Sequence, residues 1–164
     1  YSAVSVDYHG LLDATGPGQH SERLARDKRV RQTVDRYREV DRIYARYLAR
    51  VSEFLLRVQS GDRLPTVKDG LQQLEVEKLR RQAADSSDAI GRGVATRQLE
   101  QAFIAVAFYE PRGYLARGEA AKALALLDLA EAIRPGRSSV CAARQQALRM
   151  LGREAEAAAL GCGG

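Results

Sequence analysis

Residues 113–136, "GYLARGEAAKALALLDLAEAIRPG", are the stretch from which the fold can be argued most directly. An apolar helical segment ends at Gly118, and a second segment rich in alanine and leucine follows it and stops at Pro135. Small side chains at Ala123 and Ala130 allow two antiparallel helices to approach closely. The stretch therefore predicts a helix–turn–helix unit.

The features of this unit return further along the chain, in "ALRMLGREAEAAALG" (residues 147–161). The spacing is 34 residues in each case: Gly118 to Gly152 (152 − 118), Ala123 to Ala157, and Tyr114 to Leu148. About thirty-four residues is a known period for helical hairpins that bury each other's apolar faces. The sequence therefore predicts a helical repeat.

The series resembles the motif of the tetratricopeptide repeat (TPR) family over roughly residues 104–164. The first unit supplies Tyr114, Gly118, Ala123, Leu127, Ala130 and Pro135, and the second supplies Leu148, Gly152 and Ala157. Two features depart from the family pattern: Glu110-Pro111 replaces Leu-Gly, and the second unit ends at "GCGG". Pro111 is expected to kink its helix or to start a new one. A generic helical bundle with a coincidental 34-residue echo is the alternative.

The resemblance implies protein–protein binding, because the first helices of TPR units line a groove for a peptide or a partner helix. Carried over position by position, the groove residues are Phe108, Arg112 and Leu115 in the first unit and Gln146, Arg149 and Met150 in the second. Two units make a shallow groove. At least three units are usually needed for a stable stack, so the preceding helices are expected to act as the missing neighbours.

A long helix is expected over about residues 21–60, where forty residues pass without glycine or proline. Ser21 is the expected N-cap. Nine positions follow alternating steps of four and three, and all but Asp41 are apolar: Val30, Val34, Tyr37, Asp41, Tyr44, Leu48, Val51, Leu55 and Val58. This spacing predicts a seam for a partner helix, with Tyr37, Tyr44, Leu48, Val51 and Leu55 at its centre. Such a helix is about 55–60 Å long, so part of the seam is expected to face another chain.

The expected architecture is all-α. Residues 1–20 are an extended arm or linker, residues 21–103 a helical bundle that includes the long helix, and residues 104–164 the TPR-like region. Within the bundle, a second helix is expected from Thr66 to Ala84 and a third over about residues 88–110.

The positive charge gathers on the long helix. Ten basic and five acidic residues between positions 21 and 50 leave +5, equal to the formal net charge of the whole chain. Arg38, Arg42, Arg46 and Arg50 follow one another at steps of four and form an arginine ridge. The ridge is either a solvated face or a contact surface for an acidic protein, nucleic acid or a lipid surface. Nucleic acid is the weaker choice because no stacking aromatics accompany the ridge.

Sites of chemistry are not expected. No nucleophile with a base, phosphate-binding loop or metal-ligand spacing is visible, so we expect no enzyme, no cofactor, no metal and no small-molecule substrate. Cys141 and Cys162 are expected to be idle thiols, and a disulfide between them would require an oxidising compartment. No run of about 18 apolar residues predicts a membrane span. We expect a soluble domain, cytoplasmic or exported, and the start at Tyr1 leaves open a removed signal or anchor.

Three hypotheses follow, in decreasing order of preference. The first is a scaffold or accessory subunit that binds other proteins. The second is a binder of nucleic acid or another anionic surface through the basic helix 23–50. The third is a small helical-bundle enzyme.

Overall fold

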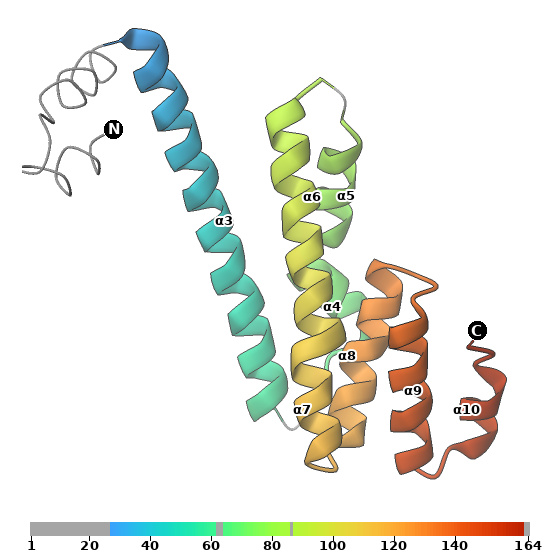
Figure 1. Cartoon of the computed structure of the whole chain (residues 1–164). Coiled ribbons are helices and arrows are strands. Elements are labelled where there is room, and N and C mark those ends of the chain that lie inside the picture. The colour runs from blue at the N-terminus through green and yellow to red at the C-terminus, as the bar shows by residue number, and fades with distance from the viewer. Residues whose placement is uncertain (1–26, 62–63, 86, 163–164) are drawn as a thin grey trace, which may run out of the picture. The chain divides into compact units, whose positions relative to one another are not determined.

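The computed structural model describes residues 27–61, 64–85 and 87–162, and these residues form helices and turns without a strand (Figure 1). The expected all-α class is therefore confirmed. The predicted arm at residues 1–20 and the predicted cap Ser21 lie outside the described residues. The chain divides into two compact units, residues 1–43 and 44–164, and each is described by itself.

The long helix is α3, Lys28–Ser60, and it is common to both units. Asp27 provides its N-terminal cap, because its carboxylate accepts a hydrogen bond from the Arg29 N–H at 2.7 Å. In the second unit, one face of α3 is buried at four residues with steps of four, three and four: Tyr47, Val51, Phe54 and Val58. That face anchors α3 in the hydrophobic core.

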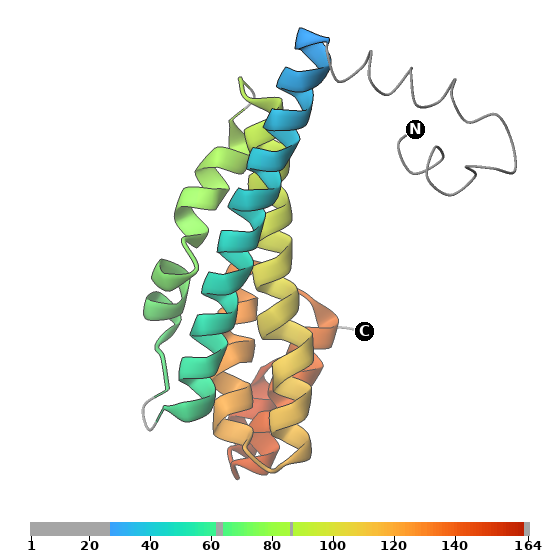
Figure 2. The ribbon, with the colours of Figure 1, turned by 90° about the vertical axis from the view of Figure 1, so that its left-hand side faces the viewer.

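The second predicted helix has the expected ends but is broken into α4, Val67–Gln73, and α5, Val76–Ala84. Figure 2 shows the short non-helical stretch between them. Thr66 and Asp69 cap α4 reciprocally in a capping box. The break falls at Glu75, which adopts a left-handed conformation with φ 52°, unusual for a residue other than glycine.

Contacts with α3 hold this break in place. The Tyr47 hydroxyl donates to the carbonyl oxygen of buried Leu74 at 3.0 Å, and the Arg50 guanidinium pairs with the Glu75 carboxylate. These contacts explain why the prediction of one continuous helix was wrong. Local helix propensity is a weak preference, and tertiary contacts override it here.

The third helix continues through Pro111 instead of kinking or restarting there. It consists of α6, Ala89–Ile104, a π-helical turn, η1, Ala105–Tyr109, and α7, Glu110–Ala116. Pro111 has no N–H to donate to the carbonyl of Ala107, four residues earlier, and its ring would clash with that oxygen in an α-helix. The wider π turn relieves this clash, so the expected kink is replaced by a local change of helix type.

The last three helices are α8, Ala120–Ile133, α9, Ser138–Met150, and α10, Glu154–Ala159. From α7 to α10, each helix packs against the next one in the chain. Helix α4 also packs against α8, and the contact is close at Gly70. A Cβ atom at that glycine would lie only 2.6 Å from Leu129 Cδ2.

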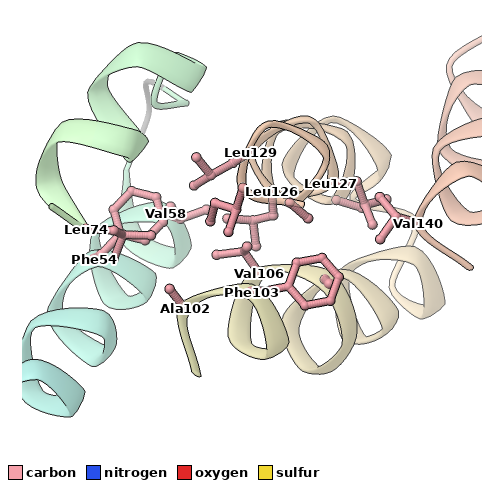
Figure 3. Close-up of a cluster of buried hydrophobic side chains, with 14 of the residues drawn as sticks. Phe54, Val58, Leu74, Ala102, Phe103, Val106, Leu126, Leu127, Leu129 and Val140 are labelled. Atoms are coloured by element: carbon pink, nitrogen blue, oxygen red, sulfur yellow. The ribbon is translucent and has the colours of Figure 1, made fainter. Parts of the chain in front are cut away.

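The hydrophobic core of the second unit is centred on α8 (Figure 3). Leu126 and Leu129 of α8 lie between Phe54, Val58 and Leu74 on one side and Val106 on another, while Leu127 faces Val140 of α9. Helix α8 is therefore buried on several sides, which explains why its sequence is apolar nearly all round.

Candidate functional site

Two turns separated by 34 residues have the same backbone geometry. Gly118 lies between α7 and α8 and Gly152 between α9 and α10, with φ values of 77° and 71°. The hydrogen bonds repeat with the same offset: Glu119 N to Tyr114 O and Arg153 N to Leu148 O, both 2.9 Å, then Gly118 N to Leu115 O and Gly152 N to Arg149 O, 3.1 and 3.0 Å. Both glycines supply the left-handed conformation that closes a helix end.

The side chains at the repeat positions are buried in both hairpins. Tyr114 and Leu148, which precede the turns, are 1% and 5% exposed, and Ala123 and Ala157, which follow them, are fully buried. A methyl group at the latter positions permits the close helix approach that the sequence predicts.

A carboxylate and a cation also recur beside each turn. Glu119 pairs with Lys122 at 2.8 Å and with Arg117 at 2.7 Å, and Glu156 pairs with Arg153 at 2.6 Å. Hydrogen bonds from Lys122 and then Arg117 lower the pKa of Glu119, and the hydrogen bond from Arg153 lowers the pKa of Glu156. Each carboxylate is therefore held in its charged form next to the turn.

The first hairpin is also tied to α3. Lys122 donates from Nζ to the carbonyl oxygen of Gln59 at 3.1 Å, in the last turn of α3. The ring of Tyr114 lies under the Arg117 guanidinium, 4.9 Å from its centroid, and near Lys122 Nζ at 5.5 Å. Burial raises the pKa of the Tyr114 hydroxyl.

The second hairpin carries a disulfide between Cys141 of α9 and Cys162, which follows α10, with the two Cα atoms 5.6 Å apart. The expectation of two idle thiols was therefore wrong, and the alternative of a disulfide describes the structure. The side-chain amide of Gln145 donates to the carbonyl oxygen of Ala157 at 3.1 Å and adds a second tie between α9 and α10.

The six predicted groove residues divide into two classes. Phe108 and Leu115 are partly buried against the core, and the Phe108 ring meets Phe103 edge to face at 5.8 Å. The other four are exposed: Arg112, Gln146, Arg149 and Met150. A partner on this side would therefore meet mainly polar and basic side chains.

The predicted helix-partner seam is used unevenly. Val51 is buried and Leu55 is partly buried in the core, while Tyr37 and Leu48 are exposed. Tyr44 is partly buried beneath the Arg97 guanidinium, 4.7 Å above its ring.

The residues that α3 buries most deeply include Tyr47 and Phe54, which the predicted seam omits. They share steps of three and four with Val51 and Val58. Two overlapping registers therefore fit the sequence, and the size of the two aromatic side chains was the signal that favoured the correct one.

The arginine ridge is partly occupied by carboxylates of the same chain. Arg38 pairs with Asp35 and Arg42 with Glu39, each at 3.4 Å and each highly exposed. Arg50 pairs with Glu75, and hydrogen bonds from Arg50 and Lys78 lower the Glu75 pKa despite its partial burial. The side chain of Arg46 is exposed. Exposed pairs of this kind contribute little stability and can exchange for another anion.

The hollow between the end of α3 and the start of α4 has a volume of about 430 Å³. Its lining includes Phe54, Val58 and Pro65, and its charged residues are Arg57 and Asp69. Within residues 27–61, 64–85 and 87–162, no group of three or more His, Cys, Asp or Glu residues could hold a metal ion. The hollow therefore lacks the converging titratable groups that general acid–base chemistry needs.

None of the helices in the described part of the chain is long and apolar enough to cross a membrane. In the same part, every buried side-chain nitrogen and oxygen atom has a hydrogen-bond partner. The structure therefore gives no orphaned polar group that would point to a missing ligand.

Comparison with known proteins returned no match: no family model, no curated protein and no solved structure is similar to this chain.

Proposed function

We propose that this chain is a non-catalytic protein-binding module, a scaffold or accessory subunit of a larger assembly, with TPR-like hairpins at its C-terminal end. One observation carries the proposal: the turns at Gly118 and Gly152 repeat their conformation and hydrogen bonds at an offset of 34 residues. A helical repeat presents extended surfaces to partners instead of enclosing a substrate pocket.

Exposed apolar side chains identify the surfaces that a partner would cover. On α3 they are Val34, Tyr37 and Leu48, and near the hairpins they are Tyr109, Met150 and Leu151. Tyr37 is 68% and Tyr109 is 76% exposed. Tyrosine is enriched at the centres of protein interfaces, because its ring buries a large apolar area and its hydroxyl keeps a hydrogen bond.

The test is site-specific photo-crosslinking in the source cells. A photoreactive residue replaces Tyr37 or Met150, and the matched control replaces Arg92, an exposed residue of α6. We expect a discrete protein adduct at Tyr37 or Met150 and none at Arg92. Absence of any adduct above the control, together with a monodisperse monomer in solution, would contradict the proposal.

Binding of an anionic surface by the basic helix 23–50 is the competing hypothesis. The internal ion pairs of Arg38, Arg42 and Arg50 speak against it, because a new anion would have to displace a carboxylate. It predicts an affinity for nucleic acid or acidic vesicles that falls steeply with salt. Replacement of all four ridge arginines by glutamine should then abolish binding, whereas the protein-binding proposal predicts no such salt-dependent binding.

A small helical-bundle enzyme is the third hypothesis. It receives the least support because the hollow beside α3 brings together only Arg57 and Asp69 as charged residues.

A further inference from the structure

We propose that the disulfide between Cys141 and Cys162 is what keeps α10 docked on α9, and that a thiol reductant releases α10 while the helices before it stay folded. This inference concerns the stability of the second hairpin and does not depend on the proposed protein-binding function.

Helix α10 is too short to persist alone. It has six residues, Glu154–Ala159, whereas isolated helices shorter than about 12–15 residues are marginal in water. Ala157 is its buried residue, and the remaining five are exposed. Burial of one methyl group contributes little to docking, so α10 must be held by other contacts.

The non-covalent contacts between α10 and α9 are few. The amide of Gln145 donates to the Ala157 carbonyl oxygen at 3.1 Å, and Leu160, just past α10, is partly buried against the core. Arg149 and Glu154 are 4.0 Å apart and both highly exposed, so this pair is weak. The stronger pair between Arg153 and Glu156 lies within the segment itself and does not connect it to α9.

Helix α8, the equivalent of α10 in the first hairpin, shows what stable docking requires. It has 14 residues and buries eight of them: Ala120, Ala123, Leu124, Leu126, Leu127, Leu129, Ala130 and Ile133. Helix α10 has no comparable apolar face. The disulfide, which spans 21 positions of the sequence, is therefore the strongest tie between α10 and α9.

Reductants can reach this bond, because Cys141 and Cys162 are both partly exposed. A thiolate of a dithiol reductant attacks one sulfur, breaks the S–S bond and forms a mixed disulfide. The second thiol of the reductant then displaces the cysteine and closes a cyclic disulfide. Two electrons and two protons pass to the protein, which ends with two thiols.

Release of α10 uncovers the face of α9 that carries Cys141, Gln145 and Leu148. These residues follow steps of four and three and thus lie along one side of the helix. Such disulfides persist in oxidising compartments and are reduced in the cytosol. The end of the hairpin region is therefore closed in an oxidising compartment and open in a reducing one.

Hydrogen exchange measured by mass spectrometry on the full chain tests the proposal, with and without dithiothreitol. On reduction, amides of residues 154–160 should exchange on the order of a hundredfold faster, as expected from loss of the loop constraint. Amides of α8 should keep their exchange rates. Unchanged exchange in residues 154–160 would show that α10 docks without the bond, and faster exchange throughout would show that the bond supports the whole fold. Either result overturns the proposal.

The matched control is the double variant Cys141→Ser/Cys162→Ser. Without reductant it should reproduce the exchange pattern of the reduced chain, and adding dithiothreitol should change nothing further. A double variant that exchanges like the oxidised wild type would refute the role of the bond.

Discussion

The two C-terminal hairpins share one turn but differ in how their second helices are held. After Gly118, α8 runs for 14 residues, and after Gly152, α10 runs for six. The backbone hydrogen bonds of the two turns match, while the burial of the two helices does not. The difference teaches that a short repeated sequence determines the turn, whereas neighbouring helices determine how firmly the hairpin is folded.

The neighbours of α8 are visible in its contacts. Gly70 lets α4 approach Leu129, and Arg80 of α5 donates from one guanidinium nitrogen to the carbonyl oxygens of Ala132 and Ile133, at 2.7 and 3.1 Å. These bonds satisfy carbonyl groups at the C-terminal end of α8 that lack helical partners. At α10 the corresponding role falls to a covalent bond.

The largest contrast is expected from truncating the residues before the two turns. Tyr114→Ala should lower the free energy of unfolding by about 4 kcal/mol, because it removes a buried aromatic ring from the central hairpin. Leu148→Ala should cost about 2–3 kcal/mol, because fewer neighbours surround it. Urea denaturation of both variants measures these losses. Exposed Met150→Ala is the control and should change stability by less than about 0.5 kcal/mol. A Leu148→Ala loss as large as that of Tyr114→Ala would contradict the contrast.

A smaller effect is expected from the turn glycines. Gly118→Ala and Gly152→Ala each force a side chain into a left-handed conformation, which costs about 1–2 kcal/mol. We expect Gly118→Ala to lower the melting temperature of the whole unit. Gly152→Ala should mainly speed hydrogen exchange in α10. Equal shifts of the melting temperature would show that both hairpins unfold in one cooperative step.

These short-range features were the part that the sequence could predict. Gly118, Gly152, Ala123 and Ala157 act through the turn and the helix next to them, and their 34-residue spacing can be read without knowing any distant contact. The relation of these hairpins to the TPR family remains a prediction.

Features that depend on distant residues were not predictable. The break at Glu75 depends on Tyr47 and Arg50, and the choice between the two registers of α3 depends on which helices cover it. The local effect of Pro111 was foreseen, but a π turn as its outcome was not. The pairing of Cys141 with Cys162 requires the chain to turn back at Gly152, and the spacing of 21 residues does not specify that.

A glycine outside the turns should respond in the opposite direction. Gly93 lies in α6, and a Cβ atom there would meet nothing within 4 Å. Gly93→Ala should therefore raise the free energy of unfolding by about 0.5–1 kcal/mol, because alanine favours the helix and restricts the unfolded chain. Thermal denaturation beside Gly118→Ala separates the two roles of glycine. A destabilised Gly93→Ala would mean that this face of α6 is in contact with another part of the protein.

The smallest contrast concerns acid. The pKa values of Glu119 and Glu156 are both lowered from the ordinary 4.5 by their hydrogen-bonded cations. A lowered pKa in the folded state stabilises the fold above the unfolded value, and this contribution is lost as the pH falls through the folded value. Glu119→Gln should therefore flatten the decline of melting temperature below about pH 4.5. Glu156→Gln should alter the decline less, because α10 contributes little to the global transition. Since both carboxylates are exposed, about 1 M salt should reduce both effects by screening. An acid response that Glu156→Gln flattens as much as Glu119→Gln does would mean that the second turn stabilises the unit as much as the first. In that case the difference between the hairpins would lie in helix length alone.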